Sequence, residues 1–194
     1  MTTKRLLPFT LLVLFVVAFT ACKKHKSNPA DSTGLPPATQ TGAKTFGCLV
    51  NGEVFVPKRK VGSINPVLQC YYQYLDDDYD KSYFWGLSAN HQGKDCELTS
   101  ISLGTDSLAI VEGKTYQLIR NGRGNASAQY TYYPNCYTLE NNYKTNDLTG
   151  GELTITYFDE INQIVSGTFW FTAVNDKGDT VRVTDGRFDM PYTR

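Results

Sequence analysis

Cysteine carries the clearest chemistry in this chain of 194 residues, which contains five of them. Cys22 directly follows an apolar run, whereas the other four are spread along the rest of the sequence: Cys48, Cys70, Cys96 and Cys136. An even number of cysteines in an exported chain favours disulfides, and four cysteines allow three pairings. We expect neighbours in sequence to pair, Cys48 with Cys70 and Cys96 with Cys136.

Zinc ligation is the alternative use of these thiols. Structural zinc sites take cysteines and histidines at short, regular spacings. The chain has no C-x-x-C pair, and its two histidines, His25 and His91, lie far apart in the sequence. We therefore expect disulfides, no metal site and no cofactor.

Aromatic side chains are the second group with binding chemistry, and they make up 13% of the chain. An exposed aromatic ring has a flat apolar face that can stack on a sugar ring. If Phe169 and Phe171 face the core of a strand, Trp170 between them faces outward. The alternative is that a loop or a second sheet covers it. The candidate ligand-binding residues are Trp170, Tyr72, Tyr74 and Trp85.

Catalytic arrangements find little support. Ser166 does not stand in a G-x-S-x-G turn, and His91 is the only histidine beyond the first quarter of the chain. Aspartates alternate between positions 76 and 80 as in a calcium loop, but Lys81 and Leu87 stand where that loop has Gly and Glu. We expect no catalytic residue and no enzyme activity.

Charge excludes a further class of partner. From Phe46 onward the chain has 13 Lys and Arg against 18 Asp and Glu. A nucleic-acid interface needs clustered basic residues, so we expect no nucleic-acid partner. The acidic residues leave a carboxylate-dependent hydrolase open as an alternative, although no spacing selects two of them.

The first 21 residues read as a signal peptide. Lys4 and Arg5 form a basic start, and Leu6 to Ala21 is an apolar run with a small residue at its end. A membrane-spanning helix needs about 20 apolar residues, and this run is shorter and contains Pro8. We therefore expect cleavage before Cys22.

The residues Phe19-Thr20-Ala21-Cys22 resemble a bacterial lipobox. The resemblance implies that Cys22 carries palmitate-type acyl chains and that the lipid bilayer is a partner of the chain. Several acyl chains together give stable membrane attachment. Lys23 in place of Asp resembles outer-membrane sorting, so we expect an outer-membrane lipoprotein that faces either the periplasm or the cell surface.

Residues 22–45 form the predicted tether between this anchor and the folded part. Pro, Gly, Ser, Thr and Ala dominate from Ser27 to Thr45, and Leu35 is the one large apolar residue there. Such a composition buries too little surface to fold alone. We expect a single domain over residues 46–194.

The domain has the sequence pattern of β-structure. Short alternating runs such as Glu152 to Phe158 are separated by turn residues, and Asn51-Gly52 between two apolar runs favours a type I′ hairpin. Hairpins follow one another through the C-terminal third. The expected fold class is all-β, an antiparallel β-sandwich, with an up-and-down β-barrel as the alternative.

Four blocks resemble those of an uncharacterised lipoprotein family of Bacteroidota. They are Val50 to Glu53 (VNGE), Gly150 to Thr156 (GGELTIT), Val165 to Phe169 (VSGTF) and Val183 to Asp189 (VTDGRFD). The resemblance spans most of residues 46–192. It implies no known activity, and it transfers no catalytic residue to this chain.

Together these features predict an envelope lipoprotein that serves as a non-catalytic binding or structural module. The first alternative is recognition of a glycan or another envelope polymer through exposed aromatics, or of an envelope protein. The second alternative is the carboxylate-dependent hydrolase.

Overall fold

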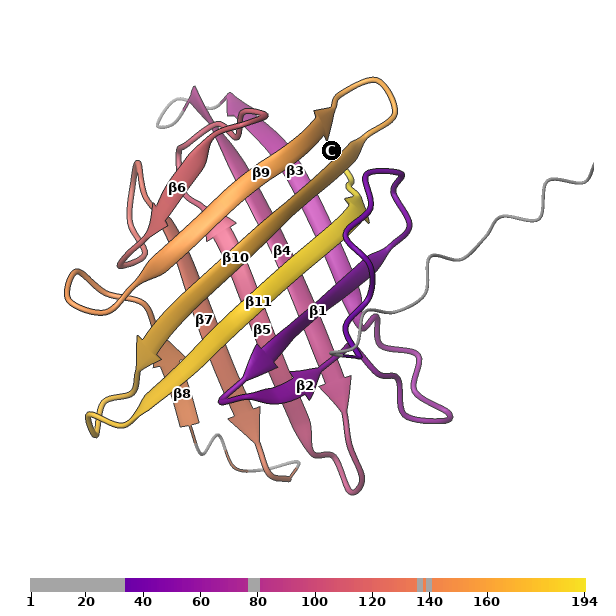
Figure 1. The fold of residues 1–194 in the computed structure, drawn as a ribbon, viewed down its shortest axis with the longest axis vertical. Coiled ribbons are helices and arrows are strands. Elements are labelled where there is room, and N and C mark those ends of the chain that lie inside the picture. Colours follow the sequence, from indigo (N-terminus) through magenta and orange to yellow (C-terminus); the bar gives the residue numbers. More distant parts are fainter. Residues whose placement is uncertain (1–33, 77–80, 136–137, 139–140) are drawn as a thin grey trace, which may run out of the picture.

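The computed structural model describes residues 34–76, 81–135, 138 and 141–194. The described residues form eleven strands and no helix (Figure 1). The strands are β1 (Thr45–Val50), β2 (Glu53–Phe55), β3 (Leu68–Asp76), β4 (Lys81–Gln92), β5 (Leu98–Thr105), β6 (Thr115–Leu118), β7 (Ala126–Tyr133), β8 (Asn141–Lys144), β9 (Gly151–Asp159), β10 (Ile164–Val174) and β11 (Thr180–Pro191). The predicted all-β class is confirmed.

Part of the sequence-based prediction lies outside these residues. The undescribed residues include the predicted signal peptide, Cys22 and the start of the tether. They also include Cys136, Asp78 and Asp80. Within the described part of the chain, no helix has the length and apolar character needed to span a membrane.

The strands form one sheet in the order β2-β1-β11-β10-β9-β6-β7-β5-β4-β3, and β8 pairs with β7 and β10. Two antiparallel meanders, β3-β4-β5 and β9-β10-β11, supply most of it. In Figure 1 the β9 to β11 layer lies in front of the β3 to β5 layer, and the strands of the two layers cross. Thr193, just beyond β11, bridges to Tyr71 on β3 and links the layers. The rolled sheet is compatible with both the sandwich and the barrel expected from the sequence.

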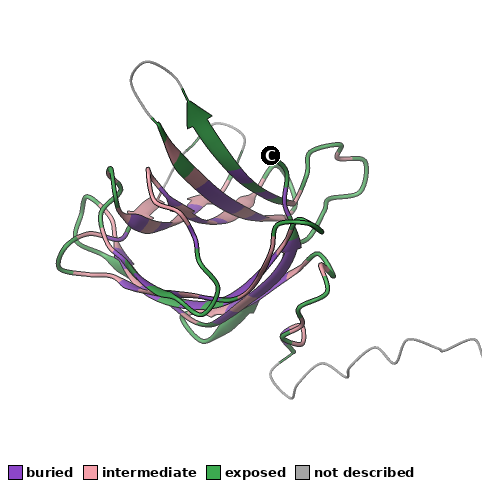
Figure 2. Ribbon diagram, turned by 90° about the horizontal axis from the view of Figure 1, so that it is seen from above, coloured by how far each residue is buried: buried purple, intermediate pink, exposed green. Residues whose placement is uncertain are grey.

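Alternation of side chains builds the core between the layers. Leu153 and Ile155 of β9 and Phe169 and Phe171 of β10 are buried, whereas the residues between them are less so. Buried segments line both layers where they curve around a common interior (Figure 2). Burial of large apolar side chains contributes about 1.5–3 kcal/mol each, so this shared interior is the main source of stability.

The turn at Asn51 and Gly52 shows how the sequence sets local structure. Both residues have positive φ, 50° and 87°, and Val50 pairs directly with Glu53. A type I′ turn requires positive φ at both central positions, which Asn and Gly tolerate best. The predicted hairpin is therefore present as β1 and β2.

The predicted disulfide between Cys48 and Cys70 is wrong. Both are buried free thiols, on β1 and β3, which are not neighbours in the sheet. Burial raises the pKa of Cys70 to about 12 and shifts that of Cys48 upward as well. They act as small apolar core residues. Cys96 is disulfide-bonded, and its predicted partner Cys136 lies outside the described residues.

Residues 34–44, here called the N-terminal strap, correct the predicted boundary of the tether. Leu35 is fully buried, and Pro36 packs over Gly47, where a Cβ would collide with the proline ring. The fully buried carboxylate of Asp189 accepts hydrogen bonds from several strap groups: Thr39 Oγ1 (2.6 Å), Thr41 N (2.9 Å), Gly42 N (2.8 Å) and Ala43 N (3.1 Å). The composition of the strap does not predict this packing, because a single leucine and a carboxylate from distant β11 hold the segment on the domain.

Candidate functional site

Two of the four predicted ligand-binding aromatics belong to the core. Trp85 is fully buried and packs against Phe188 of the opposite layer, with ring centroids 5.7 Å apart. Tyr72 is 7% exposed and meets Phe158 edge to face at 5.2 Å. The prediction that Trp85 offers a ring face to a ligand is wrong, because alternation on β4 turns it into the interior. Tyr72 also points inward, but its ring stacks on Tyr83 at 5.1 Å and lines a surface hollow.

Trp170 does lie on the surface, with 48% of its side chain exposed. Trp170 belongs to a row of paired residues that crosses three neighbouring strands. In this row Glu152 of β9 pairs with Gln117 of β6 on one side and with Trp170 of β10 on the other. The Glu152 carboxylate accepts hydrogen bonds from Trp170 Nε1 (3.3 Å) and Gln117 Nε2 (3.2 Å). These bonds give the indole a defined orientation on the outer face of the sheet.

A hollow of about 370 Å³ lies beside the indole. Its floor includes a second cross-strand row, in which Thr168 pairs with Thr154 and with Arg187. The lining is completed by Ala38 of the N-terminal strap and by the irregular stretch of β11 at Asp185, which has a positive φ of 55°. We call this feature the Trp170 surface; it is lined by Ala38, Glu152, Thr154, Thr168, Phe169, Trp170, Asp185, Gly186 and Arg187.

An aromatic plane beside hydroxyl and charged groups has the chemistry of carbohydrate recognition. The indole covers the apolar face of a sugar ring, while the polar side chains exchange hydrogen bonds with its hydroxyls. Thr115 Oγ1 and Thr154 Oγ1, 2.8 Å apart, hold the second row in place from the neighbouring strand.

Tyr74 lies in a separate place. It is 50% exposed on β3, and its ring centroid is 4.8 Å from that of Tyr83 on β4. A hollow of about 410 Å³ beside these rings also includes Tyr72, Glu160 and Arg194, so the structure brings the predicted residues Tyr72 and Tyr74 together. The hollow beside Tyr74 and the one beside Trp170 share no lining residue, so the structure does not bring these two side chains into one site.

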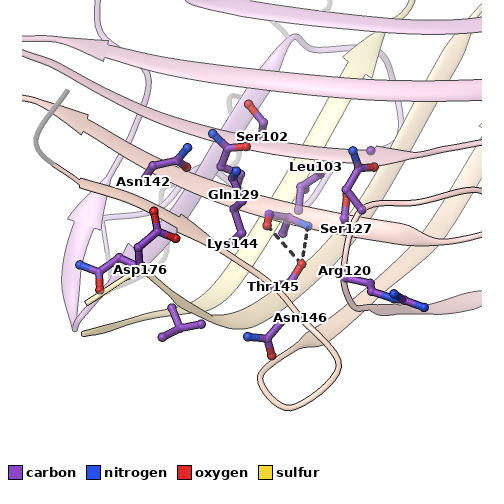
Figure 3. Close-up of a pocket in the computed structure, with 15 residues that line it drawn as sticks. Ser102, Leu103, Arg120, Ser127, Gln129, Asn142, Lys144, Thr145, Asn146 and Asp176 are labelled. Carbon is purple, nitrogen blue, oxygen red and sulfur yellow. Dashed lines mark hydrogen bonds between the residues drawn. The ribbon is translucent and has the colours of Figure 1, made fainter. Parts of the chain in front are cut away.

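Sequence reasoning missed a larger feature, here called the polar groove, of about 700 Å³ (Figure 3). It is lined by Ser102, Leu103, Gly104, Arg120, Asn121, Ser127, Ala128, Gln129, Asn142, Lys144, Thr145, Asn146, Val174, Asn175 and Asp176. Amides and hydroxyls dominate this lining. The only sequence signal is a polar residue at every second position of β5 and β7, which is also the pattern of an ordinary solvated face.

The residues considered for catalysis have structural partners. Ser166 Oγ is buried and donates to Asp189 Oδ1 at 2.9 Å, and His91 Nδ1 lies 2.9 Å from the Val56 carbonyl oxygen. Asp76 forms an ion pair with Lys81 at 3.0 Å. Within the described ranges, no group of three potential metal ligands converges.

The resolved carboxyl pKa shifts give the hydrolase alternative no support. A general acid at neutral pH needs a carboxyl group with a raised pKa. Hydrogen bonds from Asn162 lower the pKa of Asp159. Burial alone would raise the pKa of Asp189, but hydrogen bonds from Thr39 and the strap backbone lower it overall.

Comparison with known proteins identifies a family. A family model described as a domain of unknown function, DUF6252, matches residues 90–190. No curated protein and no solved structure gave a significant match. The matched residues hold most of the Trp170 surface and all of the polar groove, and they exclude β1 to β3. The expectation of an uncharacterised family agrees with this match: the chain belongs to the DUF6252 family, whose function is unknown.

Proposed function

We propose that this protein is a non-catalytic glycan-binding module, anchored to the bacterial outer membrane through lipid on Cys22. The Trp170 surface is the binding site. The anchor rests on the lipobox resemblance and on the short apolar run before Cys22.

The observation that carries the glycan assignment is the fixed, exposed indole of Trp170. Trp170 keeps 48% of its area accessible, which leaves a large apolar ring face open to a ligand. Its Nε1 is already engaged by Glu152 at 3.3 Å, so the ring face remains as the binding group. Holding the ring in advance reduces the entropy that binding would otherwise cost.

The shape and charge of the surroundings suit a neutral sugar. The hollow of about 370 Å³ is at the lower end of the volumes of small-molecule sites, which limits it to one or two sugar rings. Its lining carries two acidic side chains, Glu152 and Asp185, against one basic side chain, Arg187, and this net negative charge disfavours acidic sugars. Thr154 and Thr168 add hydroxyl groups that both donate and accept.

A glycan array with the full chain purified in detergent tests the assignment. We expect binding to at least one glycan, and Trp170→Ala to weaken it about tenfold or more, because the stacking ring face is lost. Trp170→Phe keeps an aromatic face and retains part of the affinity. Ile161→Ala removes an exposed apolar side chain from the β9–β10 turn and is the matched control.

Two outcomes would count against the glycan site: no glycan bound by the unmodified chain, or binding that Trp170→Ala leaves unchanged. The anchor has its own test. Labelled palmitate should be incorporated into the unmodified chain but not into Cys22→Ser, and the variant should leave the membrane fraction. Labelling that persists in Cys22→Ser would exclude this anchor.

A further inference from the structure

The polar groove shares no lining residue with the Trp170 surface. Its floor is a cross-strand row in which Gln129 of β7 pairs with Ser102 of β5 and with Lys144 of β8. These residues alternate with the buried Leu103 and Ala128, so they occupy the face of the sheet that points away from the core. The floor therefore presents amide, hydroxyl and ammonium groups side by side.

Two connecting segments form the walls of the groove, and hydrogen bonds hold both in place. Thr145 Oγ1 donates to the Ile119 carbonyl at 2.6 Å and accepts from Ala128 N at 3.0 Å, which ties the chain after β6 to β7. Opposite, Asn175 Oδ1 accepts from the backbone N–H groups of Lys177 and Asp179. The groove is thus formed before any ligand arrives.

One lining atom lacks the hydrogen bond that its burial demands. Asn142 Oδ1 is buried and has no hydrogen-bond partner among the described residues. Asn142 is two residues before Lys144 on β8, so its side chain shares the face that carries Gln129. A buried acceptor without a donor costs about 1–3 kcal/mol, which a ligand that donates a hydrogen bond here would recover.

The lining excludes several ligand classes. Asp176 lines the groove and Asp147 lies 3.2 Å from Arg120, so acidic side chains offset the positive charge of Arg120 and Lys144 that a phosphate site would need. β7 is paired on both sides, by β5 and by β6 and β8, so no free strand edge is present there for an extended peptide. The lining contains no aromatic side chain for stacking a planar ring such as a nucleobase.

A ligand with closely spaced hydroxyl groups fits what remains. Each hydroxyl both donates and accepts, and can therefore bond to Asn142 Oδ1 as a donor and to Lys144 as an acceptor. A volume of about 700 Å³ lies within the range of small-molecule sites. We propose that the polar groove is a second saccharide-binding site, bound through hydrogen bonds and independent of Trp170.

Nitrogen-resolved NMR of the full chain in detergent tests this proposal, because asparagine and glutamine side-chain amides report on the groove directly. The probes are glucose, galactose, mannose, N-acetylglucosamine and glucuronic acid, each at millimolar concentration, with the dipeptide alanyl-alanine for comparison. We expect at least one sugar to shift the side-chain amide signals of Gln129 and Asn142. The shifts should persist in Trp170→Ala.

Gln129→Ala should weaken this sugar about tenfold, the loss expected for one good hydrogen bond in a groove. Gln73→Ala, which removes an exposed strand glutamine from β3, is the matched control and should change nothing. Lys144→Gln alters an exposed side chain without disturbing the core, and it should weaken binding severalfold even if Gln129→Ala folds poorly.

The failures of the two proposed sites are distinguishable. Shifts confined to the Trp170 indole signal would overturn the groove proposal and leave the proposed function standing. Shifts of the groove signals without any effect at Trp170 would support the groove proposal and overturn the glycan site proposed at the Trp170 surface. Three results would overturn the groove as a saccharide site. The groove signals could shift with the dipeptide alone, they could shift with none of the probes, or sugar binding could be unchanged in both Gln129→Ala and Lys144→Gln.

Discussion

The Trp170 surface and the polar groove differ in the distance along the chain over which they are assembled. Most of the Trp170 surface comes from the β9-β10-β11 meander, whose strands follow one another. The polar groove combines β5, β7, β8, the chain after β6 and the turn after β10. A site built on consecutive hairpins can be anticipated from alternation, whereas one built on distant strands appears only when they pair.

The two regions are also held by different anchors. The N-terminal strap contributes Ala38 to the Trp170 surface, and the Asp189 carboxylate holds that strap. The groove depends on the Thr145 hydroxyl. Substitutions at the two anchors should therefore damage one region and leave the other intact.

Asp189→Ala should have the largest effect. It removes a buried carboxylate that accepts bonds from Thr39, the strap backbone and Ser166, and it leaves those donors without a partner. We expect a loss of roughly 3 kcal/mol or more in urea unfolding. Amide exchange should speed up in residues 39–43. Groove amide signals that moved as much as those of the strap would show that the two regions are not independent.

Acid should weaken the same contact, between the Asp189 carboxylate and the N-terminal strap, by a smaller amount than the substitution does. Asp189 has a lowered pKa, so its contribution to stability is present above the unfolded pKa of about 3.9 and is lost as the pH falls through the folded pKa. Unfolding free energy should thus decline below about pH 4. Asp189→Asn should lose this part of the acid dependence, and an unchanged profile would argue against the assignment.

Thr145→Val is the matching change on the groove side. The isosteric methyl group leaves Ala128 N and the Ile119 carbonyl oxygen without their partner. We expect a loss of about 1–3 kcal/mol, with weaker saccharide binding in the groove and an unchanged Trp170 surface. Calorimetric titration of the variant checks both sites, and a defect at Trp170 would contradict the separation.

Glu152→Gln should give the smallest effect. The amide oxygen can still accept a hydrogen bond from Trp170 Nε1. It lacks the negative charge that strengthens this bond and the one from Gln117 Nε2. We expect a severalfold loss of glycan affinity at the Trp170 surface and little change in the melting temperature. Normal affinity in this variant would show that Glu152 does not orient the indole.

Particular residues show how far sequence reasoning reached. The outward position of Trp170 follows from Phe169 and Phe171 facing inward, which alternation predicts. The same reasoning cannot separate the two faces of β3 and β4, where both faces carry aromatics, so only the structure shows that Trp85 is enclosed in the core and that Tyr72 is mostly buried. Cys48 and Cys70 are close in sequence, but they lie on strands that do not pair with each other, and both are free thiols.

The sequence by itself determined the β-strands and the tight hairpin turns, because the two-residue period and the φ preferences of Asn and Gly are local properties. Tertiary structure decided which strands pair, and therefore where Gln129, Lys144 and Asn142 meet. It also decided that Asp189 holds the N-terminal strap, across nearly 150 positions of the chain. Such pairings depend on the free energy of the whole core, and no short stretch of sequence encodes it.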